Sequence, residues 1–234
     1  ITLFLIKQVR SLLPESKGPL RLCYADSILR HQEAEDISRN EFFQTGVELI
    51  GRSGPDGDLE VLLLLAQALR ALGLSARYHL GSRAVFLAAF GDLPESSQAE
   101  LGHVIQFRDR AGLARLLSGR TDADALVTLF GLIDEPDGAR QRIARLKDQL
   151  PARVHALASE LADFAASARQ LEPGLDLHID FSERGSQGYH SGIVFQAYLA
   201  DLDSPVASGG RYDRLLERLG CPAPAVGFSI MLSK

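Results

Sequence analysis

The stretch "EFFQTGVELIG", residues 41–51, predicts a β-strand. Residues an even number apart face the same side of a strand, so Gln44, Gly46 and Glu48 share one face. An amide and a carboxylate on one sheet face suit an ammonium group or an imidazole N–H, and neither is stable in a core unless it is paired. The other interpretation is that these residues form the solvent-facing polar side of a half-exposed sheet.

A first strand precedes this one. The segment "LRLCYADSILRH", residues 20–31, alternates in the manner of a strand, and the polar "QEAEDISRN", residues 32–40, predicts an exposed hairpin loop between the two. Arg30 lies at the end of the first strand, where its planar donors could contact a phosphate. A lone arginine at a strand end is more often simply solvated.

Helices dominate the middle of the chain. The segment "DLEVLLLLAQALRALG", residues 58–73, has an acidic first turn, Arg70 near its end and Gly73 as a C-cap, which predicts a buried helix. A short strand is expected in "LSARYHLG", residues 74–81. From about residue 94 to 172, spaced apolar residues with polar faces predict one helix after another, which we interpret as a helical insertion beside a sheet.

Strands are predicted again after Gly174, at residues 175–181, 191–200 and 224–232. Between them "ASGGRYDRLLERLG", residues 207–220, is interpreted as a glycine turn that leads into a helix. Two glycines before a helix could bring backbone N–H groups close to an anion, although a plain turn is commoner. The order of strands, helices and strands predicts an α+β fold, with a mainly antiparallel sheet, in a single domain over residues 1–234. The first residue is not Met, so we expect this domain to be incomplete at its N-terminus.

Composition narrows the classes of function. The 234 residues are 46% hydrophobic and 24% charged, which is typical of a soluble globular protein. The net charge of -5 gives no overall basic field for nucleic acid, and none of the six histidines lies at metal-ligand spacing from another histidine or a cysteine. No signal peptide or membrane anchor is visible, and two cysteines are too few for a disulfide framework. We therefore expect a cytoplasmic protein without a metal or a cofactor, in which both thiols are buried.

Three stretches become specific when they are taken together and in order: residues 20–51, "GYHSGIVFQAY" at 188–198, and "GGRYDRLLERLGCPAPAVGFSI" at 209–230. They resemble the second motif, the histidine-binding signature and the third motif of the histidyl-tRNA synthetase catalytic domain. This resemblance implies a class II synthetase-like fold, with an antiparallel sheet flanked by helices. Carried over residue by residue, it also implies that histidine is held by Gln44, Glu48, Tyr189 and His190.

The positions that would handle ATP depart from the synthetase pattern. Residues 30–32 read Arg-His-Gln in place of Arg-His-Glu, and Asn40 stands where a further arginine is expected. Gly185 occupies the position of the catalytic arginine, and Lys234 stands where the last motif should end in arginine. Adenylate formation needs fixed cations around the phosphates, and lysine lacks the bidentate fork of arginine. The sequence therefore predicts a binding protein, without catalytic residues, that derives from an enzyme.

The same motifs are similar to those of the regulatory subunits of short-form ATP phosphoribosyltransferase, which are paralogues of histidyl-tRNA synthetase. The Tyr189-His190 pair, where synthetases have two tyrosines, favours that family. The resemblance implies a partner, the catalytic transferase subunit, in a hetero-oligomer built on homodimers, and a part in histidine feedback at the first step of histidine biosynthesis. One alternative is a functional histidyl-tRNA synthetase catalytic domain in which Arg39 and Arg184 replace the missing arginines. Another is a synthetase-like module that senses tRNA.

Overall fold

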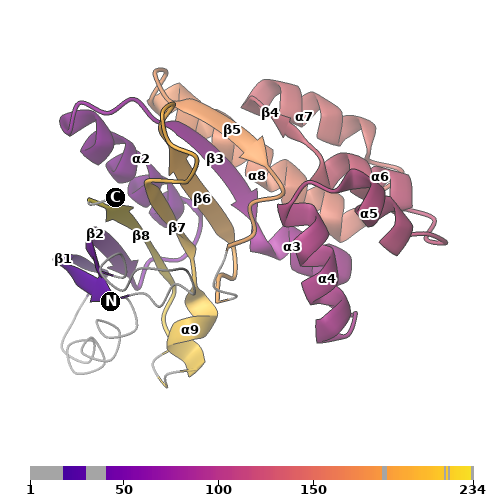
Figure 1. Cartoon of the computed structure of the whole chain (residues 1–234), viewed down its shortest axis with the longest axis horizontal. Coiled ribbons are helices and arrows are strands. Elements are labelled where there is room, and N and C mark those ends of the chain that lie inside the picture. The colour runs from indigo at the N-terminus through magenta and orange to yellow at the C-terminus, as the bar shows by residue number, and fades with distance from the viewer. Residues whose placement is uncertain (1–17, 30–40, 186–188, 219, 221, 233–234) are drawn as a thin grey trace. The chain divides into compact units, whose positions relative to one another are not determined.

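The structure is a computed structural model that describes residues 18–29, 41–185, 189–218, 220 and 222–232 (Figure 1). The chain divides into two units. Unit 1 consists of residues 1–76, 189–191 and 196–234, and unit 2 consists of residues 77–188 and 192–195. Strand β6 (Ile193–Tyr198) contributes residues to both units.

Unit 1 contains an antiparallel sheet. Strands β1 (Leu20–Leu29) and β2 (Glu41–Ile50) pair in the register that places Tyr24 opposite Gly46. Strand β2 also pairs with β8 (Ala225–Met231), where Glu48 lies opposite Gly227. The predicted strands at both ends of the chain are thereby confirmed. The predicted loop at residues 32–40 lies outside the described residues.

The prediction of a glycine turn at residues 207–211 is wrong. This segment is strand β7 (Ala207–Arg211), which pairs with β8 and is followed by the short helix α9 (Asp213–Arg218). Strand preference depends strongly on neighbours, and here β8 supplies the backbone hydrogen bonds that a lone glycine pair would otherwise lack. In that register Gly210 lies directly opposite Gly227.

Helix α2 (Pro55–Ala71) confirms the buried helix predicted in unit 1. It buries leucines and valine at helical spacing, and its C-terminus has the hydrogen bonds of a Schellman motif, from Gly73 N to Arg70 O and from Leu74 N to Leu69 O. Gly73 adopts φ 74°, a backbone conformation that glycine reaches without steric cost. Gly73 therefore located the C-terminal end of this helix correctly from the sequence alone.

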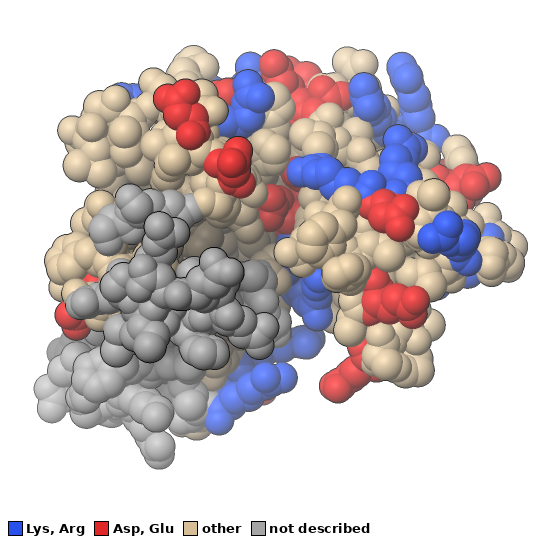
Figure 2. Space-filling model, viewed as in Figure 1, with Lys and Arg blue, Asp and Glu red and all other residues tan. Residues whose placement is uncertain are grey.

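Unit 2 combines short strands with the predicted run of helices. Strand β3 (Arg77–Ser82) is parallel to β5 (Asp176–Asp180), and the two-residue strand β4 (Ile133–Asp134) is antiparallel to β5. The helices of the predicted block are α4 (Glu95–Gln106), α5 (Arg110–Leu116), α6 (Ala123–Phe130), α7 (Pro136–Arg145) and α8 (Ala152–Leu171). Basic and acidic side chains are interspersed over the described part of the face in Figure 2.

One helix of unit 2, α3 (Arg83–Phe90), was not predicted from the sequence. Its N-cap is Ser82, whose side chain accepts a hydrogen bond from the Val85 N–H at 3.3 Å. Val85, Phe86, Ala89 and Phe90 are buried, at the spacing expected of one helix face. The serine cap and this spacing were the signals that could have found the helix.

The expectation that both cysteines are buried is wrong for Cys23, which is exposed. Cys23 lies on the face of β1 opposite Tyr24, and its neighbours on that face, Arg21 and Ala25, are exposed as well. Apolar character in a strand does not by itself tell which face is covered. Cys221 lies outside the described residues. No helix in the described part of the chain is long and apolar enough to cross a membrane.

Candidate functional site

One sheet face of unit 1 carries the two polar residues singled out on the second strand. Gln44 is 6% exposed and Glu48 is 2% exposed. The alternative interpretation, a solvent-facing polar side, is therefore wrong. A buried amide and a buried carboxylate are costly unless neighbouring groups satisfy them, so their partners define what the face can bind.

Tyr24 of β1 is the first of these partners. Its hydroxyl accepts a hydrogen bond from Gln44 Nε2 at 2.8 Å. Tyr24 lies directly opposite Gly46, and a Cβ atom at Gly46 would overlap the Tyr24 hydroxyl. The absence of a side chain at Gly46 therefore lets the Tyr24 ring cross β2 and reach Gln44. Nothing in the sequence by itself identified Tyr24 as part of this cluster.

Tyr212 is the second partner, and it comes from the segment between β7 and α9. Its hydroxyl donates a hydrogen bond to the Glu48 carboxylate. Burial and the nearby Glu48 charge raise the pKa of Tyr212 well above its ordinary value, so this phenol remains a neutral donor at physiological pH. Gly227 lies opposite Glu48, and a Cβ there would overlap the carboxylate, so Glu48 lies directly over β8. Tyr212 directly follows the glycine-containing segment 207–211, in which only the glycines were predicted to approach a ligand.

The aromatic pair of the signature joins the same cluster. The Tyr189 and His190 rings are stacked, with centroids 4.6 Å apart and an angle of 23° between their planes. Tyr189 also meets the Tyr212 ring edge-on, at 5.8 Å and 83°. Through Tyr212, the structure thus connects the predicted residues of the signature to Glu48. All of these residues belong to unit 1.

The sheet beside this cluster is built from small residues. The register places residues without bulky side chains next to Gly46 and Glu48: Gly227 and Ser229 of β8, and Ser208 and Gly210 of β7. At Gly46 and Gly227 the missing side chains leave room for the Tyr24 hydroxyl and the Glu48 carboxylate, so both polar groups lie directly on the sheet. A carboxylate, an amide and stacked rings together suit a small ligand that has a cationic group and a flat polar ring.

Arg211 fixes the backbone on which Tyr212 sits. Its guanidinium donates to Asp58 at 2.8 Å and to Asp213 at 3.1 Å, and its side chain is only 9% exposed. Burial raises the pKa of Asp58 to about 6, although the Arg211 charge opposes that rise. Ser191 Oγ accepts from the Asp213 N–H at 3.1 Å, which ties the signature segment to the same turn. Arg211 thus serves as a structural cation rather than as part of an anion site.

Of the positions that would handle ATP, Gly185 and its neighbour Arg184 are described. The Arg184 guanidinium donates to the Gly102 carbonyl at 3.1 Å and lies 5.5 Å from the Phe86 ring centroid. Burial lowers the pKa of Arg184, and the charge of Arg83 adds to that effect. Arg184 is therefore anchored to helices α3 and α4 of unit 2. The predicted phosphate contact Arg30, together with Arg39, Asn40 and Lys234, lies outside the described residues.

One group of described residues has the spacing of metal ligands: His79, Asp180 and Glu183 of unit 2. The Asp180 carboxylate already accepts from His79 Nδ1 at 2.9 Å and from the Arg108 guanidinium at 2.7 Å. It also accepts from the Ser182 hydroxyl at 2.6 Å. A metal ion would have to compete with the guanidinium for the same oxygen, so the geometry favours a structural ion pair.

The whole chain, residues 1–234, matches the family model described as histidyl-tRNA synthetase. The chain belongs to the histidyl-tRNA synthetase family. A solved structure from Bacillus halodurans C, named as an ATP phosphoribosyltransferase regulatory subunit/histidyl-tRNA synthetase, is similar with a TM-score of 0.81 and 26% identity. That match covers 97% of this chain and 60% of the other. The predicted class II synthetase-like α+β fold is thereby confirmed.

Curated members of this family are similar over most of the chain. The ATP phosphoribosyltransferase regulatory subunit of Anaeromyxobacter dehalogenans (strain 2CP-1) is 37% identical over 224 residues, which is 90% of this chain and 61% of that protein. The protein of the same name from Bordetella parapertussis is 34% identical, over 93% of this chain and 57% of its own length. The chain therefore spans about three fifths of these relatives. An ATP phosphoribosyl transferase (HisG:HisZ) complex from Thermotoga maritima shares the fold, with a TM-score of 0.69 and 16% identity.

Proposed function

We propose that this chain belongs to a non-catalytic regulatory subunit of ATP phosphoribosyltransferase that binds histidine. The names of the relatives that are 34–37% identical support this proposal. The observation that carries it is a contrast within the chain. Gln44 and Glu48 are buried and hydrogen-bonded to Tyr24 and Tyr212, so the proposed amino-acid site is kept. At position 185, by contrast, glycine replaces the catalytic arginine of the synthetases. We place units 1 and 2 in one class II domain, with residues 94–172 as its helical insertion.

The residues of unit 1 suggest how histidine would be held. The Glu48 carboxylate would accept hydrogen bonds from a cationic group of the ligand, either the ammonium or a ring N–H, while Tyr212 keeps the carboxylate oriented. The Gln44 amide, positioned by Tyr24, would bond a second polar atom. The stacked rings of Tyr189 and His190 would pack on the imidazole. A site that hydrogen-bonds both ends of its ligand rejects analogues that lack one of them.

Regulation requires more than binding. Histidine can shift the activity of an assembly only if the active and inhibited states bind it with different affinities. We therefore propose that a homodimer of the regulatory subunit joins catalytic subunits in a cytoplasmic hetero-oligomer, and that histidine binding at the Glu48 face favours the inhibited state. No bound cofactor and no metal is assigned a role.

The test is calorimetric titration of the full-length protein with histidine, alone and with ATP and magnesium, together with pyrophosphate exchange on the same sample. Histidine binding without exchange, followed by a histidine-dependent change in transferase rate when the catalytic subunit is added, would support the proposal. Histidine-dependent exchange would instead assign the chain to a functional synthetase. Absence of histidine binding would remove the proposed site.

A further inference from the structure

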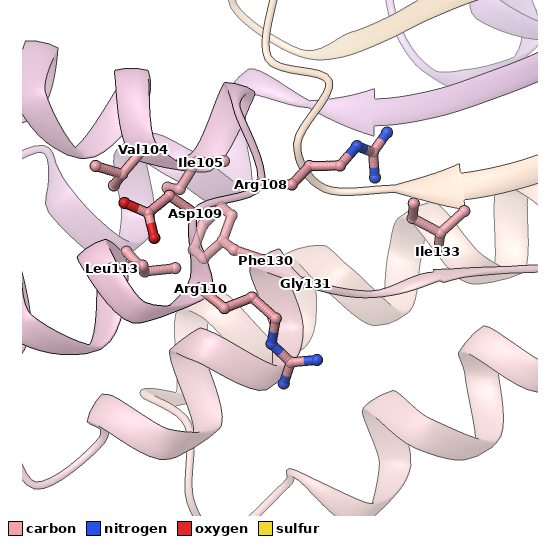
Figure 3. Close-up of a pocket in the computed structure, with 9 residues that line it drawn as sticks. All are labelled: Val104, Ile105, Arg108, Asp109, Arg110, Leu113, Phe130, Gly131 and Ile133. Carbon is pink, nitrogen blue, oxygen red and sulfur yellow. The ribbon is translucent and has the colours of Figure 1, made fainter.

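A cavity lies in unit 2, in the helical block that the proposed function leaves unused. Its volume is about 200 Å³, and nine residues line it (Figure 3). They come from the end of α4, the turn after it, the start of α5, the end of α6 and strand β4. The floor is apolar, because Ile105, Leu113 and Phe130 are each at most 3% exposed. The volume is that of one bulky apolar side chain.

The rim of this cavity is basic. Arg108 donates to the buried Asp180 at 2.7 Å, yet its side chain is 46% exposed, so part of its donor fork faces solvent. Arg110 is exposed and makes no ion pair within the described part of the chain. Figure 3 shows the carboxylate of Asp109 directed away from both guanidinium groups, and that carboxylate caps the Gly112 N–H at 2.8 Å.

Arg108 has a backbone conformation that is unusual for a residue with a side chain. Arg108 has φ 57°, in the left-handed region, and it follows the C-cap of α4 where a Schellman motif usually has glycine. The motif is complete, with hydrogen bonds from Arg108 N to Ile105 O and from Asp109 N to Val104 O. A side chain there has a steric cost, which the ion pair with Asp180 helps to offset. The ion pair thus holds a cation at the rim of the cavity.

The apolar lining of the cavity reaches the protein surface at Ile133, whose side chain is 41% exposed. Aromatic and arginine side chains around an apolar pocket are enriched at the centres of protein interfaces. A lone small carboxylate would use the arginines but would leave the apolar lining and the exposed part of Ile133 uncovered.

We propose that this basic-rimmed cavity docks a segment of a partner protein in which a bulky apolar residue adjoins an aspartate or glutamate. The apolar side chain would fill the cavity over Phe130, and the neighbouring carboxylate would pair with the Arg110 guanidinium, which points away from that of Arg108 (Figure 3). The site lies within unit 2 and does not depend on the histidine site of unit 1.

The test uses the isotope-labelled full-length protein and short blocked peptides as probes. Acetyl-Asp-Leu-amide should shift the NMR signals of residues 104–113 and 130–133, and acetyl-Asn-Leu-amide, which has the same shape without the charge, should bind about fivefold more weakly. Arg110→Gln should bring the two affinities together. Arg115→Gln is the matched control, because Arg115 is exposed on the same helix and does not line the cavity. That variant should keep the discrimination.

Two results would overturn the proposal. The first is the absence of shifts at these residues at roughly 10 mM peptide, a concentration that detects even very weak binding. The second is equal binding of acetyl-Asp-Ala-amide or inorganic phosphate, which would identify a simple anion site without an apolar requirement.

Discussion

Two buried carboxylates, one in each unit, have different surroundings. Asp180 in unit 2 is fully buried and accepts hydrogen bonds from two basic side chains, His79 and Arg108, and from a serine. Glu48 in unit 1 is 2% exposed and accepts from a phenol whose pKa is raised, so that this donor is neutral. A carboxylate neutralised by basic groups contributes to the fold, whereas one oriented by a neutral donor keeps its charge for a ligand. The two carboxylates are therefore alike in burial and differ in the chemistry of their donors, which supports the ligand-binding role proposed for Glu48.

The largest effect is expected from removal of the carboxylate in unit 2. Asp180→Ala removes the hydrogen bonds that this carboxylate accepts from Arg108, His79 and Ser182. It should lower the free energy of unfolding by about 3–5 kcal/mol, since each hydrogen bond to a charged group contributes about 1.5–3 kcal/mol. Urea denaturation measures this. Asp163→Ala is the control, because its ion pair with Arg140 is exposed on both sides, and it should change little. An equal small loss in both variants would contradict a structural role for Asp180.

The free energy of unfolding should also depend on pH through Asp180. Burial opposes its ionisation, but hydrogen bonds from His79 and Ser182 and the charge of Arg108 hold the pKa of Asp180 below the ordinary value of 3.8. Its contribution to stability is therefore present above pH 3.8 and is lost as the pH falls through the lower pKa of the folded state. Denaturation curves recorded from about pH 5 to well below pH 3.8 should show a loss of stability in the parent protein that is smaller in Asp180→Ala.

The next largest effect is a loss of histidine affinity when the charge of Glu48 in unit 1 is removed. Glu48→Gln removes the charge but keeps the shape, and should weaken histidine binding by about 10- to 150-fold, the value of a charge-assisted hydrogen bond. Calorimetric titration measures the affinity, and circular dichroism confirms the fold. Glu217→Gln, at an exposed position of α9, is the control and should bind as the parent does. Unchanged affinity in folded Glu48→Gln would remove Glu48 from the site.

A smaller effect is expected from the neutral donor. Tyr212→Phe leaves the buried Glu48 without this hydrogen bond and should reduce both stability and histidine affinity, each by about 1–2 kcal/mol. Because the pKa of Tyr212 is raised above 10.0, its contribution is present below pH 10.0 and is lost as the pH rises through the folded-state value. Denaturation above pH 10 should therefore show the parent losing its advantage in stability over the variant, which has no phenol at this position. A change in stability without a change in affinity would make Tyr212 purely structural.

The smallest effect is expected at the edge of the cluster. Tyr24→Phe removes the acceptor of the Gln44 amide and should weaken histidine binding by only about three- to tenfold, since one neutral hydrogen bond is lost. Phe43→Leu on the same sheet, at a side chain that is 43% exposed, serves as the control. A loss at Tyr24 as large as that of Glu48→Gln would mean that Tyr24 contacts the ligand directly.

The sequence by itself determined the features that depend on neighbours in the chain. The alternation of residues 41–51 placed Gln44 and Glu48 on one face, and helix signals up to Gly73 located α2 and its end. These predictions held because strand alternation and helix capping are set within a few residues. The three ordered motifs indicated the family, and the resemblance to that family pointed to Tyr189 and His190 as candidate site residues.

Tertiary structure alone decided the rest. Whether Glu48 faced solvent or the interior depended on β8 and on Tyr212, which lies 164 residues further along the chain. Pairing with β8 also makes residues 207–211 a strand, although their local sequence predicts a glycine turn. Tertiary structure also decided which face of β1 is covered, so that Cys23 is exposed. Local sequence fixes the direction in which a side chain points, but burial and hydrogen-bond partners come from segments distant in sequence, which only the folded chain brings together.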